Sequence, residues 1–249
     1  MRILIVIPLY GPLGDLRQCL TSLGVSYPGD DFFEKVANIL PFEFGDILVR
    51  NNNIENVGFT RAVNDGMRAS LTCGYDAVWV MGDDMKVMSV ASTIHEIEKE
   101  FLLRPRTGII GLQLREMDDP DLIYHGGTLR AYPTGLHKWG RVSRGDLSLR
   151  SRERWVPGGA MVISSRCIRE IGVMDERFFN ICSDSDYCYR ARAKGFDVVY
   201  LPIPVLHASG GISQNPNPQQ LERLQRDILS FRDKWLGDRR FALLDTEAL

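Results

Sequence analysis

Apolar residues follow two different spacings along the first half of the chain. Continuous apolar runs, rich in Ile and Val, are typical of buried parallel strands, whereas apolar residues three or four positions apart are typical of helices. The continuous runs predict strands over residues 2–8, 46–50, 76–81 and 107–112. The spaced stretches predict helices over residues 15–23, 60–71 and 89–103, with Ser89 as the cap of the last. Strands and helices alternate, which predicts an α/β fold with a mainly parallel sheet.

The regular alternation ends after Arg115. Glycine, proline and aromatic residues then punctuate short segments that predict hairpins or irregular loops, at His125-Gly126-Gly127, Tyr132-Pro133 and Trp139-Gly140. Further strands are predicted over residues 160–164 and 197–201, the second ended by Pro202 and Pro204. Helices are predicted over residues 166–171, 183–194 and, after a Pro- and Asn-rich turn at 215–218, over 219–235. No repeat or linker divides the chain, so residues 1–249 are predicted to form a single domain with a mixed sheet flanked by helices.

Composition and charge narrow the function classes. The chain has 249 residues, of which 44% are hydrophobic and 25% charged, as in ordinary globular proteins. A formal net charge of −2 argues against a dedicated nucleic-acid binder, although a nucleobase as acceptor is not excluded. A local excess of arginine occurs at Arg141, Arg144, Arg150, Arg152 and Arg154. Both a solvated loop and an arm that touches a phosphate or an anionic acceptor fit this cluster.

Cysteine usage and the start of the chain bear on its location. The five cysteines are odd in number, and none forms a Cys-x-x-Cys pair with zinc-site spacing, so free thiols in a reducing compartment are the better interpretation. The apolar start is too short for a signal peptide and lacks a small-residue cleavage site. No stretch approaches the roughly 20 apolar residues that cross a bilayer. We therefore expect a cytoplasmic protein without a transmembrane segment, and its oligomeric state is open.

An acidic pair, Asp83 and Asp84, directly follows the predicted strand over residues 76–81 and Gly82. In open α/β sheets, ligands bind at the carboxyl ends of the strands. Two adjacent carboxylates there suit a hard divalent ion, Mg²⁺ or Mn²⁺, which could bridge a diphosphate. An ordinary acidic turn before the next helix explains the same residues.

A glycine precedes the predicted helix over residues 60–71. Asn56-Val57-Gly58-Phe59 leads into a segment that carries Arg61. Gly58 lets the backbone approach a ligand closely, and a helix N-terminus favours anions such as phosphates. No G-x-G-x-x-G follows the first strand, which disfavours a dinucleotide-binding dehydrogenase.

Two further polar residues are candidates in the second half. Asp184 lies near the start of the predicted helix over residues 183–194, where it could cap the helix or take a proton from a hydroxyl. His207 follows the extended segment after residue 201 and could ligate a metal, although a lone histidine is more often structural.

The order of these segments resembles a known enzyme family. The segments that carry the resemblance are Ile7-Pro8-Leu9-Tyr10, Asn56-Val57-Gly58-Phe59 with Ala62-Val63-Asn64-Asp65-Gly66, Gly82-Asp83-Asp84-Met85, Gly158-Gly159-Ala160 with residues 171–179, and Asp184-Ser185-Asp186-Tyr187. Over residues 3–211 the chain resembles the inverting GT-A glycosyltransferases, specifically family 2 with its rhamnosyltransferase-like members. The resemblance implies a non-processive enzyme that moves a sugar from a nucleoside diphosphate sugar, a UDP- or dTDP-sugar, to a hydroxyl of a carbohydrate or another acceptor.

The resemblance also implies roles for individual residues. Asp84 and His207 would hold the metal, and Asp184 would be the general base that deprotonates the acceptor hydroxyl. The donor and acceptor sites would be lined by Pro8, Tyr10, Asn51, Asn56, Gly58, Arg61, Asp83, Trp155, Gly158 and Gly159. Residues 1–115 would form the nucleotide-sugar-binding half, 116–215 the acceptor and catalytic half, and 216–249 a C-terminal helix and tail.

Three departures from the family pattern keep other functions open. Gly82 replaces the first acidic residue of the Asp-x-Asp triplet, and Ser183 replaces a glutamate before the catalytic aspartate. The family usually has an aspartate after its second strand to read the base, and here Arg50 and Asn51 stand nearby. A nucleotidyltransferase could share the paired aspartates but lacks a glycine-rich, lysine-containing phosphate loop here. A catalytically inactive sugar-nucleotide binding module is the other alternative. Since no Gln-x-x-Arg-Trp motif is present, a processive polysaccharide synthase is disfavoured.

Overall fold

The computed structural model describes residues 1–132, 135–208 and 216–238. Pro133, residue 215 of the predicted turn and the tail 239–249 lie outside the described residues. The helices are α1 (Leu13–Ser22), α2 (Gly58–Cys73), α3 (Val90–Leu103), α4 (Ser165–Ile171), α5 (Ser183–Ala193) and α6 (Pro218–Trp235). The strands are β1 (Ile3–Leu9), β2 (Ala37–Phe42), β3 (Gly45–Asn51), β4 (Ala77–Met81), β5 (Met85–Val87), β6 (Thr107–Glu116), β7 (Leu122–His125), β8 (Thr128–Arg130), β9 (Leu136–His137), β10 (Gly140–Arg141), β11 (Ser151–Arg152), β12 (Ala160–Ser164) and β13 (Asp197–His207).

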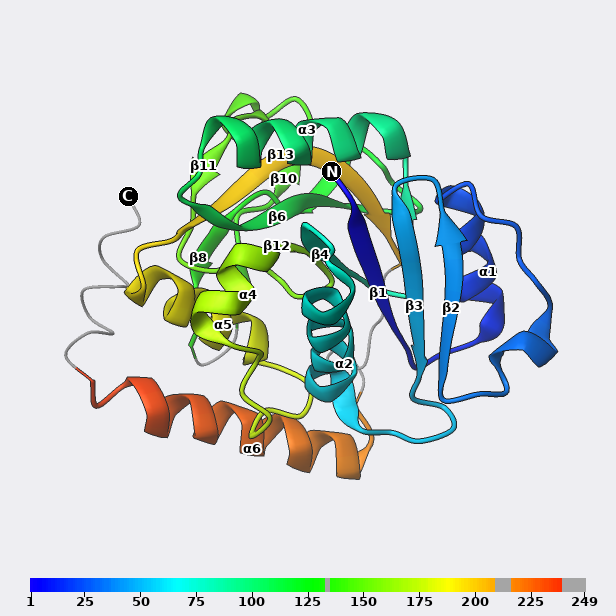
Figure 1. Ribbon diagram of the computed structural model, residues 1–249. Helices are drawn as coiled ribbons and strands as arrows, with labels where there is room; N and C mark the ends of the chain where they lie inside the picture. The colour runs from blue at the N-terminus through cyan, green and yellow to red at the C-terminus, as the bar shows by residue number, and fades with distance from the viewer. Residues whose placement is uncertain (133–134, 209–215, 239–249) are drawn as a thin grey trace.

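One twisted sheet runs through the molecule, with the strand order β10-β7-β6-β12-β4-β1-β3-β2 (Figure 1). β3, β1 and β4 are parallel, and β13 lies parallel to β6. β12 is antiparallel to both of its neighbours, β4 and β6. The predicted α/β fold with a mixed sheet is therefore confirmed. Parallel pairing is less extensive than the βα alternation predicts, because a strand from the second half is inserted between β4 and β6.

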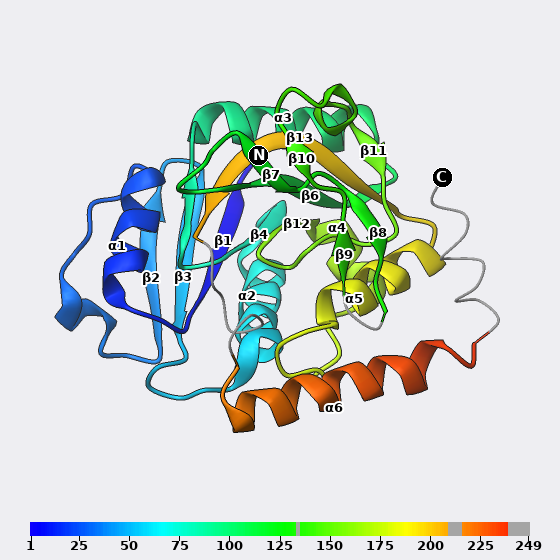
Figure 2. The same ribbon diagram turned by 180° about the vertical axis from the view of Figure 1, so that it is seen from behind.

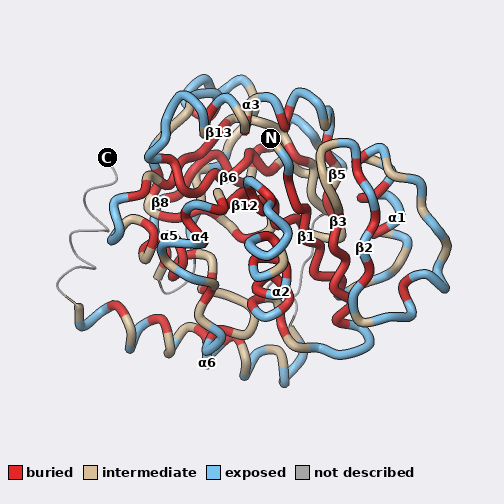
Figure 3. Tube along the Cα trace, viewed as in Figure 1, coloured by how far each residue is buried: buried red, intermediate tan, exposed pale blue. Residues whose placement is uncertain are grey.

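Helices cover both faces of this sheet (Figures 1 and 2). Alternate residues of β1 point to opposite faces: Ile5 belongs to the core under α1 and α3, and Val6 to the core under α2, α4 and α5. All of β1 is buried, which explains its continuous apolar run. Figure 3 shows these buried strands between helices whose outer faces are exposed. Burying each such Val, Leu or Ile side chain contributes roughly 1.5–3 kcal/mol.

Close packing of α2 on the sheet depends on Gly66. A Cβ atom at this position would lie 2.2 Å from Cγ2 of Val6. The glycine lets the helix backbone approach β1, and this sets the position of Gly58 at the start of α2 relative to the carboxyl end of β1.

Several element boundaries differ from the predictions. β2 was not predicted, because it is a half-exposed edge strand with alternating burial and a proline at position 41. β13 does not end at residue 201 but continues to His207, and its register against β6 shifts between Leu201 and Pro204. The prolines thus lie in an irregular stretch of the ladder and do not terminate the strand. Ser89 occupies the N-cap position of α3, but its side chain makes no capping hydrogen bond.

The C-terminal helix α6 lies across the lower edge of the molecule in Figure 1, beneath α2 and α5. It begins with Pro218 and a capping box formed by Asn217 and Gln220. Phe231 and Trp235 anchor it in the core on the α2 side of the sheet. Among the described residues, no helix combines the length and the apolar character that crossing a bilayer requires.

Candidate active site

A pocket of about 290 Å³ opens at the carboxyl ends of β1, β3 and β4. β1 supplies Pro8 near its end, and the chain segments that follow β1, β3 and β4 supply Tyr10, Asn52, and Asp83 with Asp84. The remaining lining residues are Asn56, Phe59, Gly82, Asn180, Ile181, Gln220, Arg223 and Leu224. We refer to it as the first pocket. Its position is the one expected for ligand binding in an open α/β sheet.

The two aspartates of the acidic pair have different surroundings. Oδ2 of Asp83 accepts a hydrogen bond of 2.9 Å from the backbone N–H of Tyr10, which ties the turn after β4 to the end of β1. Burial raises the pKa of Asp83 to about 6, against the effect of the Tyr10 N–H and with a smaller contribution from Asp84. Asp84 is instead directed toward β13.

The glycine before the pair lies close to the carboxylate of Asp84. A Cβ atom on Gly82 would lie 2.7 Å from Oδ1 of Asp84. An aspartate at position 82 would therefore displace the Asp84 side chain from its present position. Gly82 thus leaves room for the Asp84 carboxylate where it now lies.

His207 reaches the acidic pair through a short strand that was not predicted. β5 pairs antiparallel with the end of β13, and this register places His207 opposite Met85. Nε2 of His207 lies 3.4 Å from Oδ2 of Asp84, with side chains that are 24% and 27% exposed. The backbone N–H of Ala208 also donates to the carbonyl of Asp84. The structure thus brings together the two residues proposed as metal ligands.

The donor set tests whether a divalent ion fits here. An imidazole nitrogen and a carboxylate oxygen suit Mn²⁺, and Mg²⁺ commonly keeps several waters and substrate phosphates in its coordination sphere. Within residues 1–132, 135–208 and 216–238, no group of three His, Cys, Asp or Glu side chains converges on one point. Asp84 and His207 fit an ion that is completed by a diphosphate and water, and do not form a closed protein cage.

A second pocket, of about 470 Å³, adjoins the first. Its walls include Asp184 and three residues predicted to border the acceptor, Trp155, Gly158 and Gly159. Oδ2 of Asp184 accepts a 2.9 Å hydrogen bond from the backbone N–H of Gly158, and Oδ1 accepts one of 2.7 Å from that of Ser185. Burial raises the pKa of Asp184, and these N–H groups oppose the rise. A carboxylate with a raised pKa, fixed in orientation, is suited to accept a proton.

The two pockets share a wall formed by Phe59, Asn180 and Ile181. This shared wall is held from behind by α6. The Asp227 carboxylate accepts hydrogen bonds from the backbone N–H groups of Phe179, Asn180 and Ile181, at 2.8, 2.8 and 3.0 Å. The acidic pair lines one of these two pockets, and Asp184 lines the other.

Some predicted donor residues lie elsewhere. Arg61 lines neither the first nor the second pocket; its Nε forms a 3.2 Å ion pair with Glu176 at a neighbouring surface hollow. Asn51 is buried, and its amide donates to the carbonyl of Phe33. Gly58 has a φ of +82° at the start of α2, and a Cβ atom there would lie 2.5 Å from the carbonyl oxygen of Phe179. It shapes the loop behind the shared wall.

The arginine-rich segment after residue 140 is neutralised by carboxylates. Arg141 pairs with Asp119, Arg144 with Asp146, Arg150 with Glu100 and Arg152 with Asp197. Nη1 of Arg154 donates to the carbonyl of Leu129. Of the two interpretations of this cluster, the structure favours the one without an anionic ligand.

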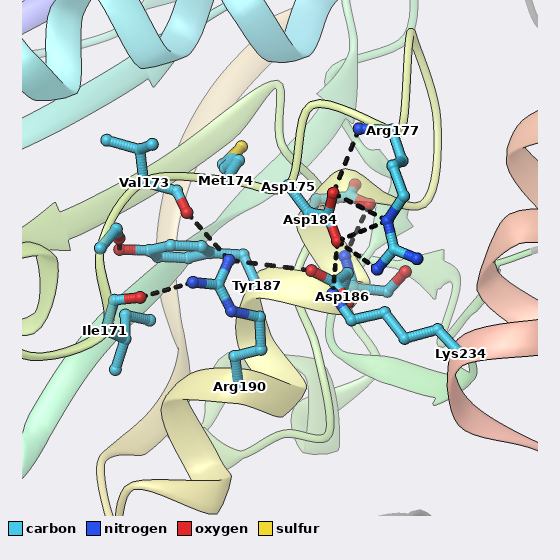
Figure 4. A network of polar contacts seen from close by, with 12 residues as sticks. Ile171, Val173, Met174, Asp175, Arg177, Asp184, Asp186, Tyr187, Arg190 and Lys234 are labelled. Carbon is cyan, nitrogen blue, oxygen red and sulfur yellow. Dashed lines mark hydrogen bonds and ion pairs between the residues drawn. The ribbon is translucent and has the colours of Figure 1, made fainter.

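The first turn of α5 is held by a network of charged residues (Figure 4). Nζ of Lys234 lies 2.6 Å from Oδ1 of Asp186 and 2.7 Å from Oδ2 of Asp175. Nε1 of Trp235 donates a further 2.8 Å hydrogen bond to Asp186. The helix that carries Asp184 is thereby linked to the end of α6. The sequence offered no signal for this role of α6, because its polar residues match an ordinary amphipathic helix.

Known glycosyltransferases are similar to this chain in sequence or in fold. No protein-family model matches the chain. A hexosyltransferase of low-salt glycan biosynthesis, Agl10 of Haloferax volcanii, is 24% identical over 191 residues, which are 73% of this chain and 57% of that protein. The chain thus spans little more than half the length of this curated relative.

Two solved glycosyltransferase structures share the fold. GalNAc-T7 with UDP, GalNAc and Mn²⁺ superimposes with a TM-score of 0.62 at 13% identity, covering 96% of this chain and 49% of that one. TarS residues 1–349 of S. aureus in complex with UDP gives a TM-score of 0.57 at 10% identity, covering 98% and 69% of the two chains. The chain therefore has the GT-A-like fold, and its assignment to family 2 or to the rhamnosyltransferase-like members stays a prediction.

Proposed function

We propose that this chain is a non-processive, inverting glycosyltransferase that moves a sugar from a nucleoside diphosphate sugar to an acceptor hydroxyl. The observation that carries the proposal is the pair of adjoining pockets. One contains the acidic pair beside His207, the other contains Asp184, and Phe59, Asn180 and Ile181 line both. Sugar transfer by the similar hexosyltransferase of Haloferax volcanii supports the same reaction class.

The first pocket is the proposed donor site. Pro8, Tyr10, Asn56 and Asp83 line it, and Asp84 with His207 would hold Mn²⁺ or Mg²⁺ beside it. When bound, such an ion supplies positive charge that stabilises a diphosphate leaving group. UDP in the TarS structure, and UDP with Mn²⁺ in that of GalNAc-T7, support a uridine diphosphate sugar as donor. A thymidine diphosphate sugar is the other donor that we propose to test.

Asp184 is the proposed general base. Its carboxylate takes the proton from the acceptor hydroxyl as the hydroxyl oxygen attacks the anomeric carbon. The N–H groups of Gly158 and Ser185 keep the carboxylate oriented toward the second pocket. Attack from the side of Asp184, with departure of the diphosphate on the side of Asp84, is a single displacement and inverts the anomeric configuration.

The proposed donor and acceptor sites are formed by successive parts of the chain. Residues 1–115 supply most of the donor site and residues 116–215 the acceptor and catalytic residues, while α6, within 216–249, contributes Gln220, Arg223 and Leu224 to the first pocket. A cytoplasmic location completes the proposal, and it is supported by the cysteines, which are all in the described part of the chain and all free thiols.

A donor screen tests the proposed function. UDP-glucose, UDP-galactose, UDP-N-acetylglucosamine and dTDP-rhamnose are each incubated with the protein, Mn²⁺ and a mixture of simple saccharides as acceptors, and phosphorus NMR identifies the released product. We expect UDP or dTDP, and EDTA should abolish both product release and the rise in melting temperature that the donor causes. Release of a sugar 1-phosphate, with transfer of the nucleotide, would assign the chain to the nucleotidyltransferases. Metal-dependent binding without any turnover would indicate an inactive binding module.

A further inference from the structure

Two histidines meet at the wall of the second pocket. His137, on β9, lines this pocket together with Asp184 and Trp155. Its Nδ1 lies 3.0 Å from Nδ1 of His125, and the two rings are nearly perpendicular at 85°. His125 is fully buried, so this contact is sequestered from bulk water. A nitrogen pair at this distance shares one hydrogen, which one ring donates and the other accepts.

The surroundings of His125 indicate which ring donates. Nε2 of His125 is buried without a hydrogen-bond partner. If Nδ1 of His137 carried the shared hydrogen, neutral His125 would bear its own hydrogen on Nε2, leaving a buried N–H without an acceptor. Orphaned buried N–H groups are rarer than underused acceptors. The favoured arrangement therefore has His125 donating, which leaves the hydrogen of His137 on Nε2.

His137 is also held uncharged. Burial lowers its pKa to about 4, so the ring is neutral near pH 7. Its ring packs against Trp155, with the centroids 5.1 Å apart. His137 thus presents an N–H donor in the pocket that also contains the Asp184 carboxylate, and no described residue forms a hydrogen bond to its Nε2.

The described lining of the second pocket carries no side chain with a permanent positive charge, since it includes no lysine or arginine. It offers aromatic surface from Phe59 and Trp155 and backbone from Pro157, Gly158 and Gly159. Aromatic faces beside a few fixed polar groups suit a ligand with apolar ring faces and hydroxyl groups.

We propose that the second pocket binds a neutral saccharide unit of the acceptor, and that His137 positions it by donating from Nε2 to a hydroxyl oxygen. A neighbouring hydroxyl of the same sugar then faces Asp184. His125 acts through His137, by fixing its tautomer. This inference rests on the proposed glycosyltransferase function and specifies the acceptor class.

Binding of simple sugars tests the inference without knowledge of the natural acceptor. The probes are the methyl glycosides of glucose, galactose, mannose and rhamnose, measured by saturation-transfer NMR in the presence of Mn²⁺ and UDP. Glucose 6-phosphate and glucuronate serve as anionic counterparts. We expect at least one neutral glycoside to bind, and to bind more tightly than either anion.

Variants then locate the binding. His137→Phe keeps a ring of similar size but removes the donor, and we expect glycoside affinity to fall about fivefold to tenfold, the effect of one lost hydrogen bond. His137→Gln restores an N–H group and should recover most of the affinity. His95→Phe, at an exposed position of α3, is the matched control and should match the wild type.

A measurement on the unmodified protein guards against misfolded variants. In a long-range ¹H–¹⁵N spectrum at pH 7, the imidazole of His137 should be neutral with its hydrogen on Nε2. The opposite tautomer, preferential binding of the anions, absence of glycoside binding, or equal affinities for His137→Phe and His95→Phe would each overturn the inference. Failure of the proposed function is a separate result, because it appears as absent binding and turnover of the nucleotide sugars.

Discussion

The carboxylate of Asp227 accepts a 2.8 Å hydrogen bond from the backbone N–H of Asn180, 47 residues away in the sequence. The neighbouring N–H groups of Phe179 and Ile181 donate to the same carboxylate. Three consecutive donors around one buried acceptor fix the backbone of this loop. Because Asn180 and Ile181 belong to both pockets, α6 determines the shape of the wall between them.

Asp227→Ala should therefore disturb both stability and ligand binding. Removing the acceptor leaves buried N–H groups without partners, and we expect a loss on the order of 3 kcal/mol in the free energy of unfolding. Urea denaturation measures this loss, and thermal shift with Mn²⁺ and UDP measures the effect on the first pocket. Asp233→Ala, on the exposed side of the same helix, should change neither. Equal stability of the two variants would show that the loop is held by other contacts.

Asp184→Asn tests the general base. The amide oxygen can accept a hydrogen bond from only one of the two backbone N–H groups, that of Gly158 or that of Ser185, and an amide does not take up a proton. We expect donor turnover to fall about 10²- to 10⁴-fold. Nucleotide binding, followed by thermal shift, should persist. Full turnover in this variant would remove Asp184 from the mechanism.

The dependence of wild-type turnover on pH should reveal the protonation of Asp184. Burial raises the pKa of Asp184 above the ordinary aspartate value of about 3.9. A base is inactive when protonated, so turnover should fall on the acid side at a higher pH than an exposed aspartate would give. An acid limb centred at or below the ordinary value would contradict the role of a buried base.

Gly58 and Gly74 form a matched pair at the two ends of α2. Both have positive φ, +82° and +71°, so alanine at either position meets the left-handed penalty of roughly 1–2 kcal/mol. A Cβ atom at Gly58 also lies 2.5 Å from the carbonyl oxygen of Phe179, whereas one at Gly74 meets nothing within 4 Å. We expect Gly58→Ala to cost about 1–3 kcal/mol more than Gly74→Ala, by urea denaturation. Equal losses in the free energy of unfolding would mean that the loop of Phe179 moves away from the added Cβ atom without a penalty.

Asp175 should make stability depend on pH. The Arg177 guanidinium, with Lys234, holds the pKa of Asp175 below its usual range despite partial burial (Figure 4). The native state therefore binds fewer protons at this site than the unfolded state. Its stabilising effect is present above the unfolded pKa of about 3.9 and is lost as pH falls toward the folded value.

Denaturation of Asp175→Asn at several pH values measures this effect. The difference in unfolding free energy from the wild type should be largest near pH 6–7 and shrink below about pH 4. Asp233→Asn, at an exposed ion pair, should differ little from the wild type throughout. A difference for Asp175→Asn that is constant with pH would exclude the charge as its cause.

The sequence predicted most buried elements because their patterns are local. β1 and β4 are apolar throughout, and α2 has its apolar residues at helical spacing. β2 alternates and lies at the edge, and β5 has three residues, so neither pattern stands out. The position of β12 between β4 and β6 depends on pairing between distant segments, which no local pattern encodes.

In the candidate site, too, local motifs identified some residues, whereas others depend on contacts between distant segments. Asp84 and Asp184 follow recognisable elements and could be identified from their motifs. The contact between Asp84 and His207 depends on the pairing of β5 with the end of β13. This pairing was not predicted, because Pro202 and Pro204 indicated that the strand ends at residue 201. His137 and Asp227 gave no signal, because a short loop strand and an amphipathic helix account for them equally well. Arg61 shows the opposite case, since its motif predicted a pocket residue and its side chain pairs with Glu176.

The insertion of β12 has a consequence for how the chain folds during synthesis. β4 and β6 leave the ribosome well before residues 160–164, and until these arrive the facing edges of the two strands lack their partner. The carbonyl of Gly159, just before β12, also accepts the 3.2 Å hydrogen bond from the N–H of Gly82. The turn that carries Asp83 and Asp84 can therefore mature only after the later strand has joined, so a nascent chain released near residue 115 would expose bare strand edges and hold an unfinished first pocket.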